Sequence, residues 1–115
     1  MEQRKFQRFK IHQMVETSLD GERFIPVDGL DISEGGLRCC SSEPVDPLAR
    51  IELLVSLPGE NEEHLIKAEA TVVRVEKIGD DYHLGVQFDA LLSEDLEALR
   101  AYLEILKDSP EDSPA

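Results

Sequence analysis

Most of the chain alternates hydrophobic and polar residues with the period of two that is typical of half-buried β-strands. Ile51, Leu53 and Val55, for example, fall on one face of a predicted strand. Turn-forming pairs such as Asp20-Gly21 separate the alternating segments. The pattern predicts six strands, at residues 10–19, 22–33, 37–41, 49–58, 65–78 and 82–88. Short strands joined by turns at regular spacing indicate a closed barrel or a sandwich.

The hydrophobic period changes to that of a helix in the C-terminal segment. Leucines recur there on one helix face, at positions 92, 96, 99, 103 and 106. Ser93 is a candidate N-cap, and Pro110 ends any continuation of the helix. The leucine stripe favours a helix that docks on an open side of the barrel, and a helix-to-helix homodimer seam is the alternative use.

The predicted elements fit a single domain. The chain has 115 residues, of which 41% are hydrophobic, enough for one modest core. No apolar run approaches the roughly 20 residues that are needed to span a bilayer. The charged N-terminus lacks the apolar segment of a signal peptide. We therefore expect a cytoplasmic protein without a membrane partner.

Positive charge is concentrated at one end of an otherwise acidic chain, whose formal net charge is −13. The stretch "RKFQRFK", residues 4–10, holds four cations, and the first ten residues sum to +3. The remaining residues carry eight cations against 24 acids, or −16. Such a chain repels long phosphate backbones, so we expect neither DNA nor RNA as a partner. A small anion held by the local basic cluster is compatible with this distribution.

The cysteines and histidines do not form a reactive or metal-binding pattern. Cys39 and Cys40 are adjacent, so on a strand they point to opposite faces, and a mutual disulfide would be strained. They have no partners at the spacing of a metal site, and His12, His64 and His83 are scattered. We expect no metal, no cofactor and no enzymatic activity, because no side chain has an evident catalytic setting.

Two short motifs carry the strongest chemical signal. Arg4 and Arg8 form R-x-x-x-R, and Asp31, Ser33 and Gly36 form D-x-S-x-x-G about 25 residues later. This pair, in this order, resembles the PilZ domain, the bacterial module that binds the second messenger cyclic di-GMP. Either half alone is a weak signal, but both halves on a matching pattern of strands are fairly specific.

The residue types suit this ligand on chemical grounds. A guanidinium can meet the O6 and N7 acceptors of guanine with two parallel bonds, and arginine also binds phosphate well. A carboxylate at Asp31 complements this, because it accepts from the N1–H and N2–H₂ donors of the base. Ser33 can bond to phosphate or hold the turn, and Gly36 permits a close backbone approach.

The resemblance covers roughly residues 4 to 106 and implies a mainly β fold, a six-stranded antiparallel barrel with one C-terminal α-helix packed against it. It implies a flexible basic ligand-binding arm at residues 1–10 and the barrel plus helix at 11–107. The Pro- and acid-rich composition of residues 108–115 predicts a disordered acidic tail. The resemblance also implies that the chain is a single-domain cyclic di-GMP receptor. The resemblance further implies that the arm is mobile without ligand and becomes ordered over it, and that the changed surface signals to an effector protein.

Several points stay open at this stage. Lys5, Gly35, Arg38 and Arg74 are weaker ligand candidates. Many family members carry an Arg where this chain has Gln3, which leaves open whether one or two nucleotides bind. The alternative function is a PilZ-like adaptor that binds proteins without the nucleotide. Monomer and homodimer are both compatible with the sequence.

Overall fold

The part of the chain that the structure describes forms seven β-strands and one helix. The computed structural model describes residues 7–11, 13–58 and 63–107. Its elements, in chain order, are β1 (Phe9–Lys10), β2 (Met14–Ser18), β3 (Ile25–Ser33), β4 (Gly36–Ser41), β5 (Arg50–Leu57), β6 (His64–Ile78), β7 (Asp81–Leu91) and α1 (Ser93–Lys107). Six of these strands match the predicted ones, and β1 is an additional short strand. Within the described part of the chain, no helix has the length and apolar character required to cross a membrane.

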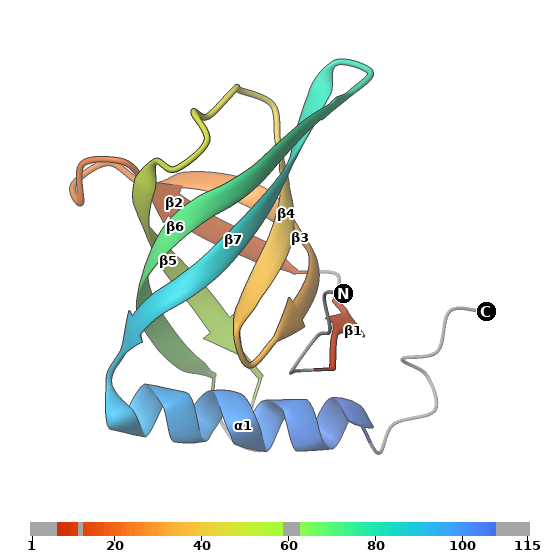
Figure 1. Cartoon of the computed structure of the whole chain (residues 1–115). Coiled ribbons are helices and arrows are strands. Elements are labelled where there is room, and N and C mark those ends of the chain that lie inside the picture. Colours follow the sequence, from red (N-terminus) through yellow and green to blue (C-terminus); the bar gives the residue numbers. More distant parts are fainter. Residues whose placement is uncertain (1–6, 12, 59–62, 108–115) are drawn as a thin grey trace, which may run out of the picture.

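The six long strands form a closed antiparallel barrel (Figure 1). Neighbours around the wall follow the order β2, β3, β4, β7, β6 and β5, and pairing between β5 and β2 completes the circle. The predicted six-stranded barrel is therefore confirmed, and the sandwich is not formed. The hairpin that joins β6 and β7 is long, and the register between the two strands shifts at Val73 of β6.

The extra strand β1 lies along the same edge of β3 as β2 does. Phe9 pairs with Ile32 and Lys10 pairs with Asp31, whereas β2 pairs with the first half of β3. Between the two, the Ile11 amide donates to the Leu30 carbonyl. The end of the basic stretch 4–10 is thereby attached to the strand that carries the first part of the D-x-S-x-x-G motif.

The core fills the barrel with the inward-facing residues of each strand. Ile51, Leu53 and Val55 are at most 5% exposed, so the alternation predicted their orientation correctly. Cys39 is buried, Cys40 is half-buried, and both are free thiols, as expected for adjacent strand residues.

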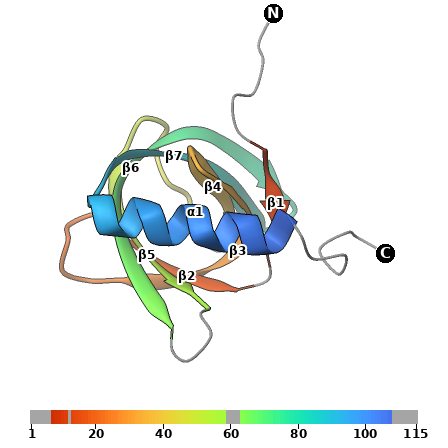
Figure 2. The ribbon, with the colours of Figure 1, turned by 90° about the horizontal axis from the view of Figure 1, so that it is seen from below.

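Helix α1 crosses one end of the barrel, and Figure 2 shows it lying over the opening between the strands. Leu99 is fully buried and Tyr102 nearly so. Asp95, in the first turn, accepts a hydrogen bond from the Lys67 amide at 3.3 Å and lies 3.1 Å from Nε2 of His64. Docking of the helix on the barrel is therefore confirmed. Leu92, the first residue of the predicted stripe, is 64% exposed and takes no part in it.

Candidate ligand-binding site

The centre of the candidate site is a buried carboxylate with an arginine on each oxygen. Arg8 donates from Nη1 to Oδ1 of Asp31 at 2.8 Å, and Arg38 donates from Nε to Oδ2 at 2.7 Å. The Asp31 side chain is 11% exposed, whereas those of Arg8 and Arg38 are 31% and 49% exposed. The two arginines thus cover an acid that belongs to the barrel wall, while part of each guanidinium faces solvent.

Strand pairing explains how residues distant in sequence meet here. Arg38 is the register partner of Asp31 across the β3–β4 hairpin, so both side chains point to the same face. Arg8 directly precedes β1, whose pairing with β3 brings it to the same place. The structure therefore brings Arg8 of the first motif to Asp31 of the second, and it adds Arg38, a weaker candidate from the sequence.

Ser33 and Gly35 stabilise the tight turn between β3 and β4. The Ser33 hydroxyl accepts from the Gly35 amide at 3.2 Å and donates to the Gly36 carbonyl at 3.3 Å. Ser33 is 4% exposed, so its hydroxyl is committed to the turn. Of the two roles that the sequence allowed for this serine, the structure contains the turn-holding one.

Gly36 packs against β7 where the two strands pair. A Cβ atom at this position would overlap the carbonyl oxygen of Val86. The preceding Gly35 carbonyl accepts from the Phe88 amide at 2.9 Å, which ties the turn to the same strand. The glycine is thus required by the close approach of two backbones.

A row of outward-facing positions extends from the site across the barrel wall. Lys10 pairs with Asp31, Asp31 with Arg38, Arg38 with Gly85, and Gly85 with Arg74. Gly85 leaves this row without a side chain between the two arginines of β4 and β6. The row thus holds three cations, and Arg8 adds a fourth at Asp31, on a protein whose net charge is −13.

The remaining candidates are placed less centrally. Arg74 is 75% exposed and lies 3.8 Å from Glu76, so it belongs to the row without contacting Asp31. Arg4 and Lys5 lie outside the described residues, as do the rest of the segment 1–6 and the predicted tail 108–115. Their predicted roles stay predictions.

Sequence reasoning missed an ion pair that joins the motif turn to the helix. Arg100 of α1 contacts Oε2 of Glu34 through Nη2 at 2.7 Å and through Nε at 2.8 Å. Glu34 is the residue between Ser33 and Gly35 in the D-x-S-x-x-G motif. The partners are 66 positions apart, so periodicity and local spacing gave no signal for this contact.

The cysteines are not poised for nucleophilic chemistry. Burial raises the pKa of Cys39 to about 12. The pKa of Cys40 is also raised, mainly by desolvation and then by the charges of Asp81 and Asp28. Both thiols are therefore protonated near neutral pH. Among the residues that the structure describes, no group of three or more His, Cys, Asp or Glu side chains could hold a metal ion.

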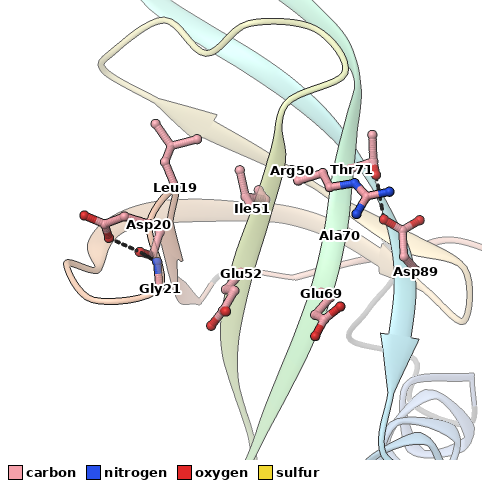
Figure 3. Close-up of a pocket in the computed structure, with 11 residues that line it drawn as sticks. Leu19, Asp20, Gly21, Arg50, Ile51, Glu52, Glu69, Ala70, Thr71 and Asp89 are labelled. Carbon is pink, nitrogen blue, oxygen red and sulfur yellow. Dashed lines mark hydrogen bonds between the residues drawn. The ribbon is translucent and has the colours of Figure 1, made fainter.

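A concavity of about 380 Å³ lies on another part of the barrel wall (Figure 3). Its charged lining is mostly acidic, with Asp20, Glu52, Glu69 and Asp89 against the single cation Arg50. None of the predicted ligand residues that the structure describes lines it. A concavity of this charge is unsuited to an anion, so the arginine-flanked carboxylate is the better candidate for a nucleotide site.

Comparisons with known proteins agree with this fold. The family model described as the PilZ domain matches residues 2–104. The inhibitor of motility MotI/DgrA of Bacillus subtilis superposes with a TM-score of 0.81 at 18% identity, covering 96% of this chain and 54% of that one. The MrkH–c-di-GMP complex of K. pneumoniae superposes with a TM-score of 0.70 at 20% identity, covering 93% of this chain and 53% of that one.

The E. coli YcgR PilZ domain with c-di-GMP superposes with a TM-score of 0.72 at 14% identity, and 92% of each chain is covered. The chain thus spans about half the length of MotI and MrkH and nearly all of the isolated YcgR domain. Among curated protein sequences, none matches significantly.

Proposed function

The chain belongs to the PilZ domain family, and on this basis we propose that it is a receptor for cyclic di-GMP. The nucleotide binds between the arginine segment and the β3–β4 turn. Arg4, Arg8, Asp31, Ser33 and Gly36 form the site, and the protein acts as a binding module without catalysis. Solved structures of MrkH and of the YcgR PilZ domain, which share the fold, contain c-di-GMP, and this supports the choice of ligand.

The observation that carries the proposal is the pairing of Arg8 and Arg38 with the two oxygens of Asp31. A carboxylate has about four acceptor sites, so Asp31 can accept from a guanine while it holds both arginines. The carboxylate would face the N1–H and N2–H₂ donors of the base. Asp31 would then hold each guanidinium beside the base, within reach of the acceptor atoms of the nucleotide.

The arginines keep donors for the ligand. Among the described residues, the hydrogen bonds to the Asp31 carboxylate come from Nη1 of Arg8 and Nε of Arg38. A guanidinium has five N–H groups, so both side chains can also reach guanine O6 and N7 or a phosphate oxygen. Lys10 and Arg74, in the same row, add positive potential for a dianion.

The same geometry supports a mechanism for signalling. Pairing of β1 with β3 fixes the chain immediately after Arg8, so any ordering on ligand binding concerns the segment before it, which contains Arg4. A nucleotide that contacts Arg4 and Asp31 would join this segment to the β3–β4 turn. The new surface would then be recognised by an effector protein, with the energy coming from contacts that exist only in the bound state.

Calorimetric titration of cyclic di-GMP into the wild-type chain and into Arg8→Ala and Arg23→Ala variants tests the proposal. We expect micromolar or tighter binding by the wild type and a loss of about 10- to 100-fold in Arg8→Ala, because a charge-assisted hydrogen bond contributes about 1.5–3 kcal/mol. Arg23 is an exposed cation of the β2–β3 loop, so its replacement controls for net charge. The titration ratio measures whether one or two nucleotides bind.

Absence of heat, together with an unchanged melting temperature at saturating nucleotide, would contradict the receptor function. The nucleotide-independent adaptor would then be the remaining reading. A pull-down with and without nucleotide distinguishes the two, because a receptor captures its effector in a nucleotide-dependent manner. The same titrations with DNA and RNA test the expectation that neither is a partner.

A further inference from the structure

The β3–β4 turn, beside which the proposed ligand binds, carries a negative charge of its own. Glu34 stands between Ser33 and Gly35, and its side chain is 26% exposed. Cyclic di-GMP is a dianion, and its phosphates would be repelled by an uncompensated carboxylate next to the turn. The site as defined by the two motifs therefore contains an unfavourable element.

Arg100 offsets this charge from outside both motifs. Its guanidinium contacts Oε2 of Glu34 through Nη2 and Nε, at 2.7 and 2.8 Å. The contact draws the carboxylate toward α1, on the side of the turn that faces the helix. Burial of Leu99 and Tyr102 holds α1 on the barrel independently of this pair, since both belong to the core cluster.

We propose that Arg100 is a positioning residue for the nucleotide site, which acts by neutralising Glu34 and holding it away from the ligand phosphates. This inference rests on the proposed cyclic di-GMP binding and extends the site to the C-terminal helix. Arg100 would then influence the affinity for the nucleotide through Glu34, without contacting the nucleotide itself.

The solvent exposure of Arg100 limits how much its pairing with Glu34 can change the affinity for cyclic di-GMP. The side chain of Arg100 is 56% exposed, so solvent and salt screen its interaction with Glu34. Exposed pairs of this kind have modest coupling energies. We therefore expect Arg100→Ala to weaken cyclic di-GMP binding by about three- to fivefold near physiological ionic strength, and by more when the salt concentration is lowered.

A charge cycle tests the inference by calorimetric titration of cyclic di-GMP into five chains: wild type, Arg100→Ala, Glu34→Gln, the double variant, and Lys107→Ala. Glu34→Gln removes the repelling charge, so it should bind at least as tightly as the wild type. The double variant should regain wild-type affinity to within about twofold, because nothing is left to neutralise. Lys107→Ala removes a cation from the end of the same helix and should bind like the wild type.

Either of two results would overturn the role of Arg100 and leave the proposed function intact, provided that the wild-type chain still binds cyclic di-GMP. One is unchanged affinity in Arg100→Ala at low and physiological salt. The other is a double variant as weak as Arg100→Ala, which would assign Arg100 to helix docking, since loss of docking is not rescued at Glu34. Failure of the wild-type chain to bind at all would instead overturn the proposed function, and this inference with it.

Discussion

Gly36 is the residue of the second motif whose requirement is set most directly by geometry. Its backbone lies so close to β7 that a methyl group would overlap the Val86 carbonyl. Because the clash is with backbone, no rotamer change can relieve it. The glycine thus secures both the β4–β7 pairing and the turn that precedes it.

We predict that Gly36→Ala lowers the free energy of unfolding by about 1–3 kcal/mol, the usual cost of overpacking, and weakens cyclic di-GMP binding. Urea denaturation and titration measure the two effects. Gly79→Ala is the matched control, since its φ of +64° costs about 1 kcal/mol but a Cβ there has no neighbour within 4 Å. The control should bind normally, and equal loss of binding in both variants would contradict a local role for Gly36.

Among individual residues, the sequence predicted the site members that belong to a recognisable motif. Asp31 and Arg8 were predicted from motif spacing, and the structure brings them into contact. The pair of Arg100 and Glu34 could not be predicted, because it depends on how α1 is oriented on the barrel. That orientation is decided by packing among residues that are far apart in the chain.

Asp95 connects the only described helix to the barrel wall. Its carboxylate is 8% exposed and accepts from the Lys67 amide of β6, while its other oxygen lies beside His64. An acid in the first turn also suits the helix dipole. The helix is thus attached by a buried polar contact in addition to its apolar face.

Replacement of Asp95 by Ala should reduce the free energy of unfolding by about 1–3 kcal/mol, because the Lys67 amide then loses its acceptor. Chemical denaturation followed by circular dichroism measures the change. Glu94→Ala is the control for the helix dipole, since Glu94 is an exposed acid of the same turn. Its replacement should lower the free energy of unfolding by less than about 1 kcal/mol. Equal destabilisation by both variants would show that the dipole, and not the contact to β6, accounts for the effect.

For the helix and strands, the hydrophobic pattern predicted where an element exists better than which of its faces is buried. The leucine stripe located α1 within a few residues, yet Leu92 is exposed and the buried face passes through Asp95, Leu99 and Tyr102. A pattern of leucines cannot reveal that an acid and a tyrosine are buried, because their partners lie on other elements. Strand β1 was not distinguished as a separate element either, since two residues are too few to show a period.

On the scale of the whole molecule, excess negative charge opposes compactness. The net charge is −13, and the described part of the chain measures 34 × 32 × 28 Å. At an ionic strength of about 0.01 M the Debye length is about 30 Å, so charges on opposite sides still repel. At about 0.15 M it is about 8 Å, and most of this repulsion is screened.

The melting temperature should therefore rise by about 3–8 °C between these two salt concentrations, equivalent to about 1 kcal/mol of stability. Differential scanning calorimetry in NaCl measures it, and the gain should level off once screening is complete. A fall in melting temperature with added salt would instead mean that specific ion pairs, such as Arg8 with Asp31, contribute more than the general repulsion.

Barrel closure is the global property that the hydrophobic pattern left open and that only the resemblance to the PilZ domain predicted. Alternation indicates which residues face inward, but it does not specify which strands pair, so a barrel and a sandwich were both allowed. The pairing of β4 with β7 joins residues about 50 positions apart, such as Gly36 and Gln87, and no local signal encodes it.

The contact between Glu34 and Arg100 has a consequence for the order of events during synthesis. A ribosome adds about 5–20 residues per second, so the 66 positions between the partners correspond to several seconds. During that interval both motifs already exist in the growing chain, while the guanidinium that neutralises Glu34 does not. On the proposed role of Arg100, the proposed nucleotide site would reach its final charge only when the helix has been synthesised, and full affinity would require the finished fold as well as the two motifs.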